Sequence, residues 1–227
     1  MSQNPPSHRT IRVVELRRYT THPQRRDALI ELFDREFIEP QEAAGIAVLG
    51  QFRDLDHADT FTWLRGFTNM RSRADALTAF YGGPVWTRCR DEANATMIDS
   101  DDVLLLEPTH LRPLAPTSAR TLDDPLVEIT IAHLATPVTD RDTARAADAM
   151  ASSCRVDMVL RTLHAINDFP RLPVREDTET LVVVSTRFGP DDARQPATAE
   201  VLDDLLGNAI RSVDTFRLRP TAGARWR

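Results

Sequence analysis

Lysine is absent from this sequence: all 28 basic residues are arginine, set against 34 acidic residues for a net charge of -6. Without lysine, the protein cannot form a Schiff base with a carbonyl substrate or use a lysine as a general base. The arginines are scattered along the chain, which indicates a compositional bias rather than a phosphate-binding cluster. A net negative chain without a basic face also argues against a nucleic acid as partner.

Cysteines and long apolar runs are also scarce. The two cysteines, Cys89 and Cys154, have no CxxC spacing, which argues against a disulfide framework and favours a reducing compartment. The longest apolar runs, Val103–Leu106 and Leu181–Val184, are far too short to cross a bilayer. The first residues lack the apolar stretch of a signal peptide. We therefore expect a cytoplasmic protein with no membrane partner.

Cofactor and metal motifs are missing as well. Gly82-Gly83 is typical of a helix end rather than of a phosphate-binding loop, and no nucleophile motif such as Gly-x-Ser-x-Gly occurs. The histidines follow no metal-ligand spacing. The sequence thus predicts neither a cofactor nor a metal. One alternative stays open, because His133 or His164, near strand ends of the second half, could serve as a haem ligand.

What the sequence does contain is an internal repeat. Arg12–Tyr19 and Pro125–Ala132 are strand-like runs that carry a lone glutamate, Glu15 or Glu128, at matching positions. Each run is followed by a helix, two strands, a helix and a strand, which is the ferredoxin-like order. Such a unit leaves one apolar sheet face bare, and that face needs a partner.

The expected fold is therefore α+β, with two tandem ferredoxin-like (βαββαβ) units whose sheets pack face to face as a dimeric α/β-barrel. We place the units at residues 11–108 and 125–220, joined by a proline-rich linker at 109–124. Whether the barrel closes within one chain or between two chains is left open. Strands are expected at 12–20, 46–54, 60–67, 102–107, 126–134, 156–166, 178–188 and 212–218, and helices from Pro23, from Ser72, from Pro84, at 140–152 and at 192–206.

The first half resembles a known family. Val14–Thr20 is similar to the opening strand of NIPSNAP domains, Met70–Arg73 after Phe67 resembles the strand-to-helix segment, and Val103–Pro108 fits the closing strand. This resemblance covers residues 12–108. It implies the dimeric α/β-barrel superfamily, a central cavity, and relatives that include cofactor-free monooxygenases, lactone isomerases, polyketide cyclases and haem-using enzymes. The chain departs from the family pattern at the end of the third strand. Many members have an aromatic residue, any residue and a second aromatic residue there, whereas this chain has Arg65-Gly66-Phe67.

Candidate catalytic residues lie on the first strand. Glu15, Arg17 and Tyr19 alternate, so they share one strand face. Because the apolar Val14 and Leu16 are expected to meet the helices, the polar trio is predicted to face the barrel interior. Glutamate as base, arginine as anion clamp and tyrosine as proton donor suit enolisation or cyclisation. The alternative is an ion pair with a purely structural role.

Glu15→Gln separates those two roles. If Glu15 is a base, the substitution lowers the rate on the order of 10²–10⁴-fold and leaves folding intact. If the pair is structural, the variant unfolds.

Candidate substrate-binding residues lie on the third strand. Phe61, Trp63, Arg65 and Phe67 are alternate residues of this strand, so their side chains point to the same face of the sheet. That face is aromatic and carries a single charge. Such a face can hold a flat apolar ligand beside a cation. It can equally serve to pack the two sheets together. Glu128 is the corresponding candidate in the second half.

Two functions remain in competition. The first is a cofactor-independent enzyme of monooxygenase, isomerase or cyclase type that acts on an apolar or aromatic metabolite in the barrel cavity. A role in biosynthesis and assembly as a homodimer are expected with it. The second is a non-catalytic ligand-binding or protein-interaction protein. An open barrel interior that contains Glu15 or Glu128 favours the first, and an interior filled by side chains favours the second.

Overall fold

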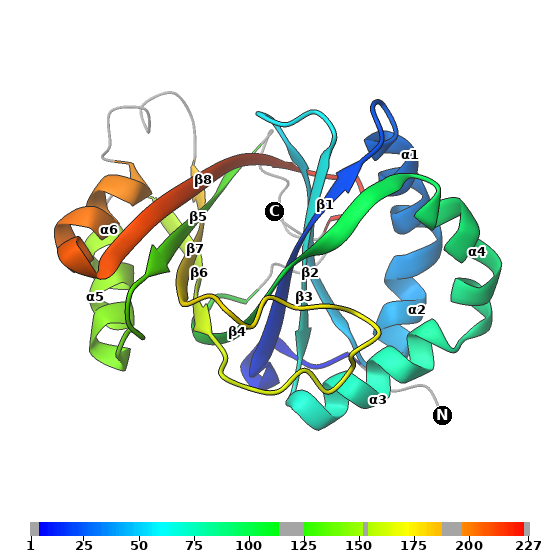
Figure 1. Cartoon of the computed structure of the whole chain (residues 1–227), viewed down its shortest axis with the longest axis horizontal. Helices are drawn as coiled ribbons and strands as arrows, with labels where there is room; N and C mark the ends of the chain where they lie inside the picture. The colour runs from blue at the N-terminus through cyan, green and yellow to red at the C-terminus, as the bar shows by residue number, and fades with distance from the viewer. Residues whose placement is uncertain (1–4, 114–124, 152–153, 188–196, 225–227) are drawn as a thin grey trace.

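The computed structural model describes residues 5–113, 125–151, 154–187 and 197–224 of the chain. Its strands form one closed barrel in the order β1-β3-β2-β8-β5-β7-β6-β4. Helices lie against the barrel on two opposite sides, α1 to α4 on one and α5 with α6 on the other (Figure 1). The expected mixed α+β fold with a barrel-forming sheet is thereby confirmed.

The elements have the following bounds. The strands are β1 Val13–Thr21, β2 Ala47–Asp54, β3 Thr60–Phe67, β4 Met97–Leu111, β5 Leu126–Leu134, β6 Arg155–Thr162, β7 Thr180–Arg187 and β8 Ile210–Pro220. The helices are α1 Arg26–Leu32, α2 Ile38–Ala43, α3 Met70–Tyr81, α4 Pro84–Asn94, α5 Asp140–Met150 and α6 Thr198–Leu206. A π-helical turn, Phe33–Phe37, connects α1 to α2. Among the described residues, no helix is long and apolar enough to cross a membrane.

Each half of the chain contributes four neighbouring strands to the barrel. The first half supplies β4-β1-β3-β2 and the second supplies β8-β5-β7-β6, and the pairs β2–β8 and β4–β6 join them. All of these pairs are antiparallel. The barrel thus closes within one chain, and a second copy is not needed to complete it.

The barrel interior is a packed apolar core. Its side chains come from strands of both halves, and nearly all of them are fully buried: Val14, Leu16, Leu49, Phe52, Leu64, Leu104, Leu106, Val127, Ile129, Ile131, Met158, Leu160, Val182, Val184 and Leu218. An eight-stranded barrel is just wide enough for its own side chains to fill it. In the part of the chain that the structure describes, apolar side chains therefore occupy the barrel interior, where the family resemblance implied a central cavity.

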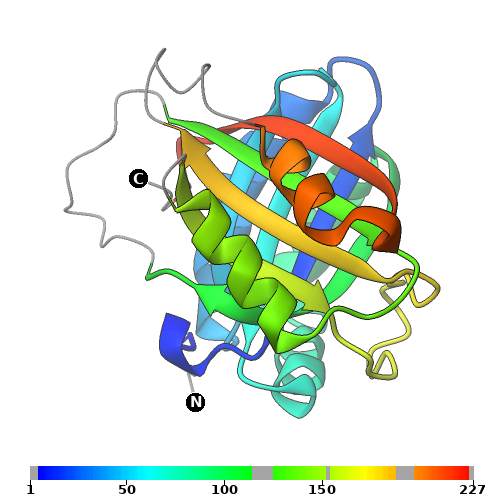
Figure 2. The same ribbon diagram turned by 90° about the vertical axis from the view of Figure 1, so that its left-hand side faces the viewer.

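Two further cores lie outside the barrel, between the strands and the helices. α5 and α6 lie across the outer face of the second-half strands (Figure 2). The core beneath them is aliphatic. The core under α1 to α4 is rich in aromatic side chains, including Phe33, Phe37, Phe61, Trp63 and Phe80. This aromatic core lies on the opposite face of β1 and β3 from the barrel interior, and it contains the candidate site.

Several element ends differ from those expected. Pro40 lies inside α2, and the π-helical turn precedes it, because proline has no N–H to donate and its ring crowds the carbonyl one turn earlier. Asn69, rather than Ser72, caps α3. β4 continues to Leu111 by pairing with β6, so it enters the predicted linker, of which residues 114–124 lie outside the described residues. The expected start of the last helix also falls outside them, since 188–196 are not described.

Candidate functional site

Glu15, Arg17 and Tyr19 share one face of β1, as predicted, but that face meets the helices and not the barrel interior. Tyr19 packs in the aromatic core, whereas Val14 and Leu16 lie in the interior. The expected orientation is therefore wrong. The physical reason is that Val14 and Leu16 pack with the apolar side chains of both halves in the barrel interior, while the helix side accommodates the polar trio among aromatic rings.

Glu15 is the centre of a buried arginine cluster. Arg17 Nη1 donates to Glu15 Oε2 at 2.6 Å, and Arg65 Nε donates to the same oxygen at 2.8 Å. Arg73 Nε donates to the other carboxylate oxygen, Oε1, at 2.6 Å. All four side chains are at most 1% exposed. One carboxylate thus holds three guanidinium groups away from water.

Local structure explains how the three arginines meet. Arg17 lies two residues along β1 from Glu15, and Arg65 is its direct cross-strand partner on β3. Arg73 comes from the first turns of α3, where the Asn69–Ser72 capping box fixes the start of the helix and Arg73 N–H bonds Asn69 C=O at 3.0 Å.

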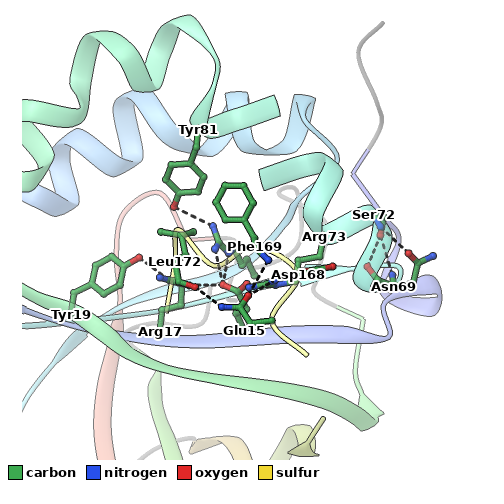
Figure 3. Close-up of polar contacts among 12 residues, drawn as sticks. Glu15, Arg17, Tyr19, Asn69, Ser72, Arg73, Tyr81, Asp168, Phe169 and Leu172 are labelled. Atoms are coloured by element: carbon green, nitrogen blue, oxygen red, sulfur yellow. Dashed lines mark hydrogen bonds and ion pairs between the residues drawn. The ribbon is translucent and has the colours of Figure 1, made fainter. Parts of the chain in front are cut away.

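The second half of the chain contributes a further anion. Asp168, in the segment between β6 and β7, forms an ion pair with Arg73, and Asn167 accepts a bond from the same guanidinium at 3.2 Å. Figure 3 shows Arg17 and Tyr19 on one side of Glu15 and Arg73 with Asp168 on the other. Three guanidinium groups against two carboxylates leave one net positive charge in the cluster.

The cluster keeps its charges under ordinary conditions. Burial alone raises the pKa of Glu15, but Arg65, Arg17 and Arg73 outweigh burial and hold that pKa far below its usual range. Burial raises the pKa of Tyr19, with Arg17 opposing, so Tyr19 is a neutral phenol near pH 7. A carboxylate so strongly stabilised is a poor proton acceptor. The geometry therefore favours Glu15 as the residue that orients the arginines rather than as a base.

This pKa shift predicts a defined acid sensitivity. Because the folded-state pKa of Glu15 is lowered, its stabilising contribution is fully present above the ordinary glutamate pKa of about 4.3 and is lost as pH falls below it. We expect the free energy of unfolding to decline more steeply below about pH 4 in the wild type than in Glu15→Gln. Urea unfolding of both proteins from pH 7 to pH 3 measures this, and parallel curves would contradict it.

A cavity of about 90 Å³ lies beside the cluster, under the helices of the first half. Arg17 and Tyr19 form its polar wall, and Arg17 Nε donates to the Tyr19 hydroxyl at 2.7 Å. Arg17 also lies over the rings of Tyr19 and Trp63, at 5.4 Å and 5.8 Å from their centres. We call this space the aromatic cavity; its remaining lining is Leu29, Phe33, Phe37, Gln41, Phe80, Tyr81, Trp86, Ala93, Asn94, Met97, Ser100 and Leu172.

The segment after β6 covers this region. Leu172 is the lining residue that comes from the second half of the chain, and Phe169 packs on the ring of Tyr81 with 6.0 Å between ring centres. Backbone bonds from Leu163 N–H to Leu105 C=O and from Arg175 N–H to Val103 C=O hold the segment to β4. In Figure 1 it is the yellow loop that reaches across from β6 toward the helices of the first half.

The predicted substrate-binding residues separate into three groups. Trp63 lines the aromatic cavity. Arg65 belongs to the Glu15 cluster, and Phe67 packs on Arg65, 5.6 Å from its guanidinium carbon to the ring centre, without lining the cavity. Glu128 is on β5 in the other half, where Arg187 lies 3.4 Å away. Glu128 is therefore not among the residues that line the aromatic cavity.

The two histidines considered as haem ligands contact carboxylates. His133 Nε2 lies 3.0 Å from Asp214, and His164 Nε2 lies 3.1 Å from Glu179. Neither histidine lines the aromatic cavity. Within the described ranges, no group of three or more His, Cys, Asp and Glu side chains is arranged to hold a metal ion.

Sequence reasoning missed four members of this site. Arg73 stood in the family-like segment, but nothing in its spacing linked it to Glu15. Tyr81 is on α3 and Gln41 is on α2, and both line the aromatic cavity. Asp168 lies in a segment of no regular structure, 95 residues from Arg73.

The fold and site define an α+β barrel protein with an arginine cluster and an aromatic cavity outside the barrel, under the helices of its first half. Residues 14–113 match the model of the NIPSNAP family, so this half of the chain carries a NIPSNAP domain, as the resemblance predicted. No curated protein sequence matches the chain.

Solved structures share the fold across nearly the whole chain. A candidate monooxygenase from Lactobacillus acidophilus NCFM is 14% identical, with a TM-score of 0.58, and the match covers 94% of this chain and 98% of that one. An anthrone oxidase-like protein is 16% identical, with a TM-score of 0.56 and coverage of 95% and 94%. A chlorite dismutase from Candidatus Nitrospira defluvii is 13% identical, with a TM-score of 0.53 and coverage of 96% and 92%. At these identities the likeness establishes the fold alone.

Proposed function

We propose that this protein binds a small aromatic molecule in the aromatic cavity and acts on it as a cofactor-independent enzyme of monooxygenase, isomerase or cyclase type. The observation that carries the proposal is the cavity wall itself: a fully buried guanidinium, Arg17, and a neutral phenol, Tyr19, line a space whose other walls are mostly aromatic and aliphatic side chains. Ligand sites in proteins typically combine an apolar lining with a few convergent polar groups. The site proposed here replaces the barrel interior, which is filled.

Arg17 is the residue we assign to charge stabilisation. Enolisation, isomerisation and cyclisation of aromatic ketones all develop negative charge on an oxygen, and a preorganised buried cation lowers the barrier to forming it. The Tyr19 hydroxyl oxygen accepts a hydrogen bond from Arg17 Nε. The hydroxyl proton of Tyr19 is therefore available to a ligand oxygen. Glu15, Arg65 and Arg73 would serve as positioning residues, because they fix the place and charge of Arg17.

The size of the cavity limits what can bind without movement. A volume of about 90 Å³ corresponds to roughly three water molecules and is below the ~150 Å³ at which an engineered apolar cavity holds benzene. A ring-sized ligand therefore requires a displacement of the lining. Leu172 is the candidate for it, because it belongs to the irregular segment between β6 and β7 rather than to a strand or helix.

We further propose that residues 11–108 and 125–220 are tandem ferredoxin-like units, with 109–124 between them. The strand orders β4-β1-β3-β2 and β8-β5-β7-β6 support this, as does the position of Glu15 and Glu128 at the third residue of β1 and of β5. Assembly into a homodimer remains a prediction.

A coloured phenol tests binding at Arg17. With 4-nitrophenol as probe, a cation in the cavity should favour the bound phenolate and lower the apparent pKa of the probe. Arg17→Met keeps an apolar stem without the charge, and it should weaken binding of the phenolate roughly tenfold to a hundredfold. Because Glu15 retains two guanidinium partners, this variant is expected to fold. Absorbance titration reads both effects, and unchanged affinity in Arg17→Met would contradict the proposal.

Turnover is tested separately with anthrone as substrate. Anthrone is chosen because one of the structural neighbours is described as anthrone oxidase-like. Oxidation of anthrone to anthraquinone consumes one O₂ and releases one water, so oxygen uptake without added cofactor measures it. We expect uptake above the uncatalysed rate in the wild type and a loss in Arg17→Met. Binding without turnover would favour the second candidate, a non-catalytic ligand-binding protein, which the filled barrel interior also supports.

A further inference from the structure

Two side chains that line the aromatic cavity each carry a buried polar atom without a hydrogen-bond partner. Gln41 lines the cavity from α2 and Trp63 from β3, and both side chains are buried, at 1% and 2% exposure. Gln41 Oε1, an acceptor, and Trp63 Nε1, a donor, are both unpartnered. The backbone of Gln41 is engaged, since its C=O accepts from Ile46 N–H at 3.0 Å, so the unpartnered atom belongs to the side chain alone.

Such atoms are costly in an empty cavity. A buried donor or acceptor without a partner costs about 1–3 kcal/mol, and native proteins leave few of them. Here the side chains that carry this donor and this acceptor line the same small space, which Arg17 also lines. Aliphatic or aromatic side chains line most of the remainder, and a leucine at position 41 would remove the cost. The arrangement is therefore better explained by a ligand than by packing.

We infer that Gln41 and Trp63 determine ligand specificity and select a hydroxylated arene, with a hydroxyl donating to Gln41 Oε1 and a ligand oxygen accepting from Trp63 Nε1. This inference rests on the proposed function and deepens it by naming the substrate class. A plain hydrocarbon leaves both atoms unpartnered. An aryl ether or a carboxylate satisfies Trp63 but has no proton for Gln41. A phenol, or a hydroxylated aromatic ketone, satisfies both and places an oxygen near Arg17.

The experiment compares two probes of nearly equal size and shape, phenol and toluene. Binding to the whole chain is measured by calorimetry and by quenching of tryptophan fluorescence, since Trp63 and Trp86 line the cavity. The wild type should bind phenol about tenfold or more tightly than toluene after correction for their transfer from water, because only phenol provides partners for both buried atoms.

Three variants locate the source of that preference. Gln41→Leu and Trp63→Phe each remove one unpartnered atom while keeping an apolar lining, and each should reduce the phenol-to-toluene ratio by about tenfold. Thr62→Val is the matched control: Thr62 Oγ1 is another buried atom without a partner, but Thr62 does not line the cavity. It should leave the ratio unchanged. Without ligand, Gln41→Leu should be at least as stable as the wild type, because leucine removes the buried acceptor that has no partner. A residue kept for binding at the expense of stability shows this behaviour.

The outcomes distinguish this inference from the proposed function. Both probes could bind the wild type while Gln41→Leu and Trp63→Phe show the same phenol-to-toluene affinity ratio as the wild type. In that case the two atoms do not contact the ligand and the specificity assignment is wrong, although the cavity remains a ligand site. If neither probe binds the wild type in a saturable way, the proposed function fails and the specificity assignment fails with it. A Gln41→Leu protein that unfolds more easily than the wild type would show that the amide is structural.

Discussion

Glu15→Gln is expected to destabilise the protein by about 3–5 kcal/mol, the range seen when one member of a buried ion pair is removed. In the wild type a single carboxylate, itself fully buried, partners Arg17, Arg65 and Arg73 within 2.8 Å. A neutral amide in its place leaves three guanidinium groups with only the partly exposed Asp168 as counter-charge. Because a typical domain is stable by only 5–15 kcal/mol, a loss of this size is easily seen in urea unfolding.

Glu107→Gln is the matched control for this substitution. Glu107 accepts from Arg161 Nε at the same 2.6 Å distance, but both side chains are partly exposed, at 36% and 24%. Exposed ion pairs contribute about 0–1 kcal/mol, so the same chemical change should have little effect there. Equal losses in both variants would contradict the buried-cluster interpretation. A fully stable Glu15→Gln protein with lost activity would instead restore Glu15 as the base that the sequence predicted.

The strand period predicted part of this site correctly. Alternation placed Glu15, Arg17 and Tyr19 on one face of β1, and the same rule placed Trp63 and Arg65 together on β3. It could not say which face meets the helices, because both faces of β1 are buried and an alternating pattern is the same from either side. The assumption that apolar residues meet helices failed because the closed barrel interior demands apolar residues more strictly.

The remaining members of the site depend on long-range contacts that no local pattern encodes. Arg73 reaches Glu15 across 58 residues, and only the path of α3 over the sheet brings them together. Asp168 belongs to the second half of the chain and crosses to the first through an irregular segment, for which neither period nor propensity makes a prediction. By contrast, the strands β2 and β3 and the Gly82-Gly83-Pro84 break between α3 and α4 follow from local patterns of strand and terminator residues. Both occur as predicted, within a residue at the strand ends.

Phe52→Ala is expected to cost about 3–5 kcal/mol, because it removes a large side chain from the filled barrel interior. Phe52 is fully buried there, among aliphatic side chains of both halves. Ile166→Ala is the control for a large apolar residue that the fold does not bury, since Ile166 is 89% exposed; a surface change of this kind is usually within about 0.5 kcal/mol. Urea unfolding measures both.

The Phe52→Ala result also decides where a ligand can bind. If the interior is a close-packed core, the wild type has no room for a probe there, and the loss in Phe52→Ala reflects both lost burial and a new void. A cost below about 1 kcal/mol would mean that the interior was already loose enough to collapse or to hold a ligand. The barrel interior would then be the better candidate for the ligand-binding site. The assignment of that site to Arg17 and the aromatic cavity would be wrong.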